Sequence, residues 1–199
     1  MSKNRIIIDL EATCDDKRQL PVEEMEIIEI GACLVNENFE VLDEFQTLIR
    51  PQVHPKLDPF CTQLTHITQE MVDGAPCYDQ AIAAFDAWVE KCDVQEWCSW
   101  GDYDRKQFER NAALLNREKP LVLSLIHTNI KQLYGQVVGV KRAPGVNKAL
   151  GYEGLSFEGT LHRGLDDAKN IARLGKVAFG LTQSAWKNRP AIQIKSPSP

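Results

Sequence analysis

The sequence predicts an α/β fold in which helices cover both faces of one mixed β-sheet, and three observations predict it. Residues 6–8 form an uninterrupted β-branched run, which is typical of a strand buried on both faces. Two further extended segments follow this run closely, as in a hairpin. Beyond them, helical and extended patterns alternate along the chain, which favours strands and helices packed in layers.

The first predicted strand ends in two carboxylates. Asp9 and Glu11 come directly after the apolar run and are separated by one residue. Because side chains alternate along a strand, both should project from the same side. Such a pair repels and raises its own pKa values unless a cation lies between them, and a hard divalent metal with oxygen ligands would be that cation. A solvated turn is the alternative, so a metal site requires other carboxylates to converge here.

The segments after this strand predict a hairpin beside it. Residues 14–24 are polar, which indicates an exposed loop. Residues 26–35 then predict a second strand, 36–38 a turn and 39–49 a third strand. Glu29 lies inside the second strand, so this buried acid either supports the metal site or hydrogen-bonds to nearby backbone.

The middle of the chain predicts helices on either side of a fourth strand. Residues 50–59 form a proline-marked crossing, after which Thr68 caps a short helix. Apolar residues recur at helical spacing over 78–91, which predicts an amphipathic helix against the sheet. Residues 96–100 predict a strand, and a helix follows from about 101 to 116.

The C-terminal part predicts short elements followed by one long helix. In order, the short elements are a strand at 121–127, a helix capped by Thr128 or Asn129 and running through Val138, a basic turn at 141–145, and a short helix at 146–150 closed by Gly151. The long helix spans 164–179 and keeps its apolar residues on one side. The chain thus divides into one domain over 1–181 and a polar, mobile tail over 182–199.

Composition excludes several classes of protein. Hydrophobic residues make up 43% and charged residues 26%, as in ordinary soluble proteins. No apolar run is long enough for a membrane span or a signal peptide, so we expect a cytoplasmic protein with no membrane partner. The net charge of -5 argues against a large basic surface for nucleic acid, but not against an enzyme that holds a few phosphates near a metal. The six cysteines lack zinc-site spacing and indicate reduced thiols.

Two later segments could bring further acids to Asp9 and Glu11. Asp104 follows Tyr103 at the start of a predicted helix, and Asp167 follows His162 by five residues at the start of the last helix. Each residue also has an ordinary structural interpretation. Asp104 could be a helix N-cap, His162 a loop residue, and Asp167 a partner of the helix dipole.

The order and character of these segments resemble the DEDDh, or DnaQ-like, superfamily of 3'-5' exonucleases. The segments at 9–14, 60–65 and 164–173 are most similar to its Eri branch, which includes the 3' histone mRNA exonuclease and KapD-like proteins. The resemblance runs from about residue 5 to residue 179. It implies a ribonuclease H-like sheet with helices on both faces.

The resemblance also implies a two-metal mechanism. Asp9 would bridge two Mg²⁺ or Mn²⁺ ions, Glu11 and Asp167 would complete the ligands of the first, and Asp104 would hold the second directly or through water. His162 would be the general base that takes a proton from the attacking water. His162 and Glu11 are therefore the catalytic candidates.

The implied substrate is the 3' end of a single-stranded nucleic acid, with RNA favoured over DNA and nucleoside 5'-monophosphates as products. The residues expected to contact the terminal nucleotide are Ala12, Thr13, Leu64, Thr65, Tyr103 and His162. The cations expected to follow the phosphate backbone are Lys141, Arg142, Lys148 and Arg163. Family analogy also suggests a homodimer.

One departure and three alternatives accompany this interpretation. The family's second motif often has an Asn shortly before its Asp, and here that stretch is Ser99-Trp100-Gly101-Asp102, so Asp104 is chosen over Asp102 by its aromatic predecessor. A DNA-directed proofreading or repair exonuclease of the same superfamily is the first alternative. The second is a haloacid-dehalogenase-like phosphatase, because residues 7–13 resemble the opening of its motif with Asp9 as nucleophile. The third is a nucleic-acid-binding module without catalysis.

Overall fold

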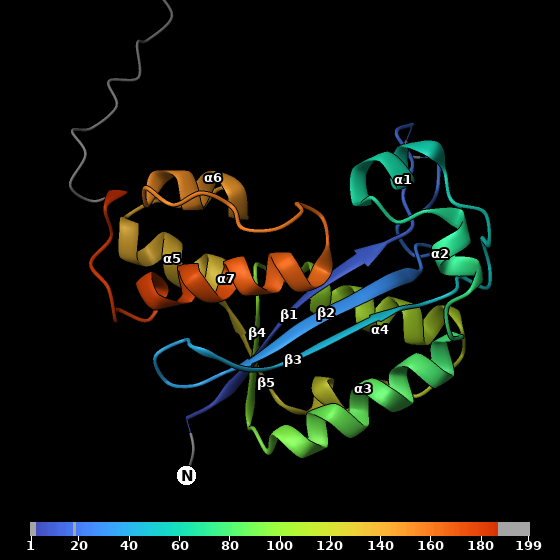
Figure 1. Ribbon diagram of the computed structural model, residues 1–199, viewed down its shortest axis with the longest axis horizontal. Coiled ribbons are helices and arrows are strands. Elements are labelled where there is room, and N and C mark those ends of the chain that lie inside the picture. The colour runs from blue at the N-terminus through green and yellow to red at the C-terminus, as the bar shows by residue number, and fades with distance from the viewer. Residues whose placement is uncertain (1–2, 18, 187–199) are drawn as a thin grey trace, which may run out of the picture.

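The structure, a computed structural model, describes residues 3–17 and 19–186. Its centre is one five-stranded sheet with the strand order β3-β2-β1-β4-β5 (Figure 1). The strands are β1 (Arg5–Ala12), β2 (Ile27–Val35), β3 (Val41–Leu48), β4 (Glu96–Ser99) and β5 (Ile126–Asn129). The pairs β1/β2 and β2/β3 are antiparallel, whereas β1/β4 and β4/β5 are parallel. The predicted mixed sheet and hairpin are confirmed.

Helices cover both faces of this sheet, as predicted. The helices are α1 (Pro59–Thr65), α2 (Gln69–Asp73), α3 (Tyr78–Cys92), α4 (Tyr103–Leu114), the 3-10 helix η1 (Leu121–Ser124), α5 (Ile130–Val138), α6 (Val146–Tyr152) and α7 (Gly164–Ala178). Figure 1 shows α3 and α4 below the sheet, α5, α6 and α7 above it, and α1 near the tip of β1. Each layer encloses its own cluster of buried apolar side chains.

Strand β1 lies in the middle of the sheet and explains the β-branched run. Ile6 and Ile8 pack in the cluster between the sheet and helices α3 and α4, whereas Ile7 packs in the cluster between the sheet and α7. All three are fully buried. The alternation continues past the apolar residues, because β1 runs on to Ala12. The carboxylates Asp9 and Glu11 therefore lie in the last residues of the strand and project from the same side of it, as predicted. They share the face of Ile7, on which α7 packs.

Three local features differ from the predictions. Helix α1 was not predicted, although Asp58 caps it and Pro59 occupies its first turn, which is a recognisable start signal. The strand predicted at 121–127 is a 3-10 turn at its beginning, and only its last residues pair as part of β5. Gly151 lies inside α6 rather than closing it, and the helix ends at Tyr152 with Glu153 as its C-cap.

Two predictions concern the ends of the chain and its environment. The tail predicted over 182–199 falls mostly on residues 187–199, which lie outside the described residues. Across residues 3–17 and 19–186, every helix is too short or too polar to cross a lipid bilayer.

Candidate active site

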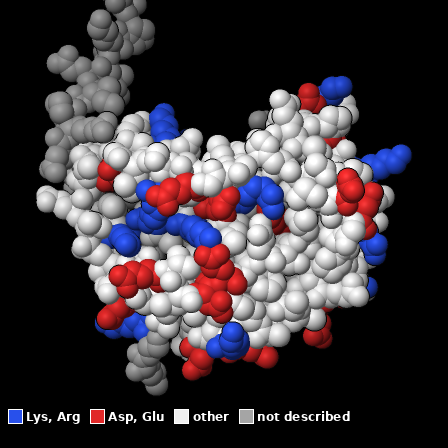
Figure 2. Space-filling view, in the orientation of Figure 1, with Lys and Arg blue, Asp and Glu red and all other residues white. Residues whose placement is uncertain are grey.

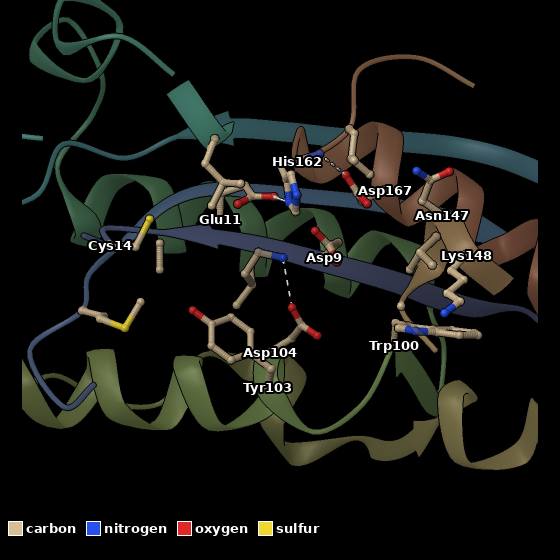
Figure 3. A pocket seen from close by; sticks show the side chains of 17 residues that line it. Asp9, Glu11, Cys14, Trp100, Tyr103, Asp104, Asn147, Lys148, His162 and Asp167 are labelled. Atoms are coloured by element: carbon tan, nitrogen blue, oxygen red, sulfur yellow. Dashed lines mark hydrogen bonds and ion pairs between the residues drawn. The ribbon is translucent and has the colours of Figure 1, made fainter. Parts of the chain in front are cut away.

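Three acids from β1 and α7 meet at one point above the sheet. Asp9, Glu11 and Asp167 each offer a carboxylate oxygen, and these oxygens all lie within 4.8 Å of one another. Asp9 and Glu11 come from alternate positions of β1, and Asp167 comes from the first turn of α7. Figure 3 shows all three at the centre of a cavity. The neighbouring acid Asp166 instead accepts a hydrogen bond from the Thr160 amide.

Two glycines allow α7 to approach the sheet closely enough for this meeting. Gly31 pairs with Asp9 across β2 and β1, and a Cβ on Gly31 would lie 1.9 Å from the backbone of Gly164 and Leu165. A Cβ on Gly164 would lie 2.9 Å from the Asp9 carbonyl oxygen. Any other residue at Gly31 would therefore push the start of α7 away from Asp9.

The buried carboxylate of Glu29 holds the start of α7 through an ion pair and hydrogen bonds. Its carboxylate is fully buried and accepts hydrogen bonds from the Arg163 guanidinium, the Gly164 amide and the Gln46 side chain. Glu29 faces Glu11 across β2 and β1. Of the two roles left open for this acid, support of the acidic cluster fits the structure, and the support acts by anchoring the start of α7.

Asp104 reaches the site from the opposite direction. It lies in the first turn of α4, is only 3% exposed and accepts a hydrogen bond from the Leu10 amide at 3.1 Å. It is not part of the three-carboxylate cluster, but it is the neighbouring charge that most raises the pKa of Asp9. Asp102 has a half-exposed side chain that lies 4.0 Å from the His127 ring, so Asp104 is the acid that faces the cluster.

His162 stands at the edge of the same cluster. Its Nδ1 lies 3.9 Å from the Glu11 carboxylate, and its backbone N–H donates to the Asp167 carboxylate at 2.8 Å. The residue has a left-handed backbone with φ of 61°, which directs the chain into α7 just after it. Burial and the nearby His66 lower the pKa of His162, so its ring is neutral and can accept a proton at neutral pH.

Burial raises the pKa of all four acids. Burial, followed by the charges of Asp104, Asp167 and Glu11, raises the pKa of Asp9 well above its usual value. Burial and the charge of Asp167 raise the pKa of Glu11 to about 9. Burial also raises the pKa of Asp167 to about 7 and that of Asp104 to about 6, although hydrogen bonds from backbone amides oppose both shifts. The protein itself supplies too little positive charge for four ionised carboxylates.

This arrangement fits divalent cations. Its donors are all carboxylate oxygens, which suit Mg²⁺ or Mn²⁺, and three of them are close enough to share one ion. Arg163, which directly follows His162, is already paired with Glu29. A bound cation would remove the repulsion that raises the pKa values.

The cavity around the acids has a volume of about 620 Å³. The predicted site residues that line it are Asp9, Glu11, Ala12, Leu64, Tyr103, Asp104, His162 and Asp167. Figure 2 shows a hollow in the upper outline of the molecule, between the helices above the sheet and α1.

Two predicted substrate contacts do not reach the cavity. The Thr13 amide donates to the Glu26 carbonyl, and its hydroxyl accepts from the Glu26 amide. Thr65 is fully buried, and its hydroxyl donates to the Cys61 carbonyl. Both threonines therefore shape the chain next to the cavity, Thr13 after β1 and Thr65 at the end of α1.

The cavity also contains residues that were not predicted. Trp100 and Asn147 lie on the side of the acids away from Tyr103, next to Lys148, which was predicted only as a phosphate contact (Figure 3). Trp100 directly follows β4, so its position after a strand parallel to β1 was a usable signal. Asn147 lies at the start of α6, and its neighbour Lys148, predicted as a phosphate contact, was a usable signal for it.

Comparison with known proteins gives a consistent family. The family described as Exonuclease (RNase_T) matches residues 6–174. The 3'-5' exoribonuclease 1 of Mus musculus is 35% identical over 176 residues, which cover 84% of this chain and 50% of that protein. The chain thus spans about half the length of the curated relatives that it matches first.

Solved structures agree with this assignment. The nuclease domain of 3'hExo, described as a DEDDh family member bound to rAMP, superposes with a TM-score of 0.80 at 30% identity, covering 90% of this chain and 94% of that one. A 3'-exonuclease that recognises the 3' end of a histone mRNA stem-loop superposes with a TM-score of 0.79 at 30% identity, covering 90% of this chain and 65% of that one.

Proposed function

This chain belongs to the exonuclease family RNase_T, in its DEDDh form, and from this premise we propose that it is a metal-dependent exonuclease that hydrolyses RNA from the 3' end and releases nucleoside 5'-monophosphates. One observation carries the proposal. Asp9, Glu11 and Asp167 bring their carboxylate oxygens within 4.8 Å of one another, and the His162 ring lies beside them. Family membership also removes the support for the phosphatase alternative.

The acids would hold two Mg²⁺ or Mn²⁺ ions. Asp9, Glu11 and Asp167, whose carboxylate oxygens lie together, would hold one ion, and Asp9 with Asp104 on the α4 side would hold the other. When bound, such ions neutralise charge on the phosphate oxygens, activate water and stabilise the departing 3' oxygen. The chain's own part is to fix these carboxylates on a strand and two helix starts, which leaves them little freedom to move.

His162 is the proposed general base. Its ring opens on the cavity and is neutral at neutral pH, so it can take the proton of the attacking water. The hydrogen bond from its backbone N–H to the Asp167 carboxylate ties the backbone of His162 to the cluster.

The terminal nucleoside would occupy the part of the cavity beside Ala12, Leu64 and Tyr103. Tyr103 is 42% exposed and offers an aromatic face on which a base could stack, a contact worth about 1–3 kcal/mol. The preference for RNA is supported by the names of the relatives, which include exoribonucleases and a histone mRNA exonuclease. A homodimer and a cytoplasmic location stay predictions.

A digestion assay tests the proposal. RNA and DNA strands of matched sequence, labelled at the 5' end, are incubated with the protein in Mg²⁺, in Mn²⁺ or in excess EDTA. We expect RNA ladders that shorten from the 3' end, release of nucleoside 5'-monophosphates, and no cleavage in EDTA.

Variants make this assay specific to the site. Asp9→Ala and His162→Asn should abolish or strongly slow the ladder, whereas Asp16→Ala, at an exposed acid outside the cavity, should leave it unchanged. Faster digestion of DNA than RNA would favour the DNA-directed alternative. RNA binding without any cleavage by the wild type would favour the non-catalytic alternative.

A further inference from the structure

A second cavity carries only positive charge. It has a volume of about 620 Å³, and its charged lining residues are Lys131 on α5 with Lys141 and Arg142 in the turn that follows. No Asp or Glu lines it, and none of the three cations forms an ion pair within the described part of the chain. Three unpaired cations in one groove of a protein with net charge -5 indicate a site for anions.

The two cavities are joined by one stretch of chain. Val140, Lys141, Arg142 and Ala143 line the second cavity, and the residues from Gly145 to Lys148 line the first. Between these two sets, the Pro144 carbonyl accepts a hydrogen bond from the Trp100 indole at 2.9 Å. Lys131 of the second cavity also lies near the residue after Trp100, since its Cδ would be 4.0 Å from a Cβ placed on Gly101.

The first cavity itself has two halves. Figure 3 shows Cys14 and Tyr103 on one side of the acids, and Trp100 with Lys148 on the other. Trp100 packs against Tyr134, with ring centroids 5.6 Å apart, and also borders the cavity. The exposed Lys148 stands next to it and has no carboxylate partner among the described residues. A strand whose terminal nucleoside lies beside Tyr103 would leave the acids across Trp100 and Lys148.

We propose that the groove lined by Lys131, Lys141 and Arg142 binds backbone phosphates of the single-stranded substrate on the 5' side of the scissile phosphate, with Trp100 and Lys148 carrying the strand between the two cavities. This inference rests on the proposed function for the polarity of the strand. It adds a site for the part of the substrate that is not cleaved. A groove of this kind makes affinity depend on strand length and on salt concentration.

The test compares a dinucleotide with a strand of more than about 16 nucleotides, the upper end of the site sizes known for OB folds that bind single strands. The variant Lys141→Ala/Arg142→Ala is paired with the control Lys119→Ala/Lys176→Ala, which removes the same charge from residues outside both cavities. We expect the first variant to raise the KM for the long strand by about 10-fold, with little change for the dinucleotide or in kcat. The control should behave as the wild type.

A binding experiment separates this inference from the proposed function. The anisotropy of a labelled long strand is measured in EDTA, where no cleavage is expected, over a range of salt concentrations. The slope of log K against log salt should become shallower by roughly 0.7 for each phosphate that the variant no longer neutralises. Replacing upstream phosphates by neutral methylphosphonates should weaken binding to the wild type and not to the variant.

Three outcomes would overturn the inference. They are binding of the long strand by the variant as tightly as by the control, an equal rise in KM for the dinucleotide, and failure of the wild type to bind the long strand. The first result together with normal 3' digestion by the wild type would leave the proposed function intact. Salt-dependent binding through the groove without any digestion would instead contradict the proposed function alone.

Discussion

At the scale of single residues, the site depends on side chains whose positions are fixed through the backbone. The His162 amide holds the Asp167 carboxylate, and the Leu10 amide holds that of Asp104. These bonds orient two acids while partly offsetting the rise in their pKa values. The remaining repulsion is left for a cation to remove.

The first prediction concerns His162. His162→Asn keeps a residue that tolerates the left-handed backbone but removes the proton acceptor. We expect kcat to fall by about 10²–10⁴-fold with little change in KM, because a general base acts mainly in the transition state. Steady-state kinetics on a short RNA measures both constants. His54→Asn is the control, since His54 pairs with Glu24 outside the cavity, and an equal loss in both variants would contradict the role of His162.

The second prediction concerns Asp9. Asp9→Asn keeps the size of the side chain but removes one charge from the cluster. We expect the free energy of unfolding without metal to rise by about 1 kcal/mol or more, because an uncompensated charge costs at least about 1–3 kcal/mol. We also expect the stabilisation by Mg²⁺ to disappear. Denaturant titrations with EDTA and with Mg²⁺ measure both effects, and Mg²⁺ stabilisation equal to that of the wild type would refute the assignment of Asp9 as a ligand.

At the scale of elements, the site is set by the contact between α7 and the hairpin β1/β2. Helix α7 meets the sheet backbone to backbone at Gly31 and Gly164, and the buried Glu29 anchors Arg163 at its start. Helix α4 supplies Asp104 from the opposite face of the sheet. The distances between the acids therefore depend on how the first turns of α4 and α7 pack against β1.

The third prediction concerns Gly31. Gly31→Ala should destabilise the fold by about 1–3 kcal/mol, because the new Cβ would overlap the backbone of α7. Activity should fall as well, since Asp167 would move away from Asp9. Thermal denaturation and the digestion assay measure the two effects. Gly151→Ala is the matched control, because that position in α6 has open space and should tolerate Ala or gain stability.

At the scale of the whole molecule, acidic and basic side chains gather in different cavities. The described part of the chain gathers four acids in the first cavity and three unpaired cations in the second. On the face that Figure 2 shows, acidic and basic side chains lie interspersed. In the proposals above, these cations would bind phosphates of the substrate and the acids would bind metal ions.

The fourth prediction concerns the pH dependence of stability without metal. In the unfolded chain Glu11 loses its proton near its usual pKa of 4.5, whereas in the folded protein it keeps the proton up to about 9. Between these values the folded state binds more protons, so the free energy of unfolding falls as pH rises. Denaturation in EDTA across this range measures the slope.

A variant isolates the contribution of Glu11 to that slope. Glu11→Gln cannot titrate, so it should lose less stability than the wild type between pH 4.5 and 9. Saturating Mg²⁺ should stabilise the wild type most at the upper end of the range, where the acids are ionised. A wild-type stability without metal that falls no faster than that of Glu11→Gln would contradict the crowding of carboxylates.

The sequence by itself determined the mixed sheet, the order of most elements and the residues Asp9, Glu11, Asp104, His162 and Asp167. Local patterns predicted the elements, because β-branched runs and helical periodicity lie in neighbouring residues. The set of site residues was instead implied by the resemblance of separate segments to an exonuclease family. The tertiary structure decided what depends on long-range contact. Only folding shows that Gly31 admits the close approach of α7, and that the hydroxyls of Thr13 and Thr65 bond to backbone groups while neither residue lines the cavity. The contact at Gly31 joins backbones that lie more than a hundred residues apart in the chain, and no local pattern encodes such a contact. The partners of the two threonines are closer in the chain, but the backbone group that each hydroxyl meets is set by the folded loop or helix around it.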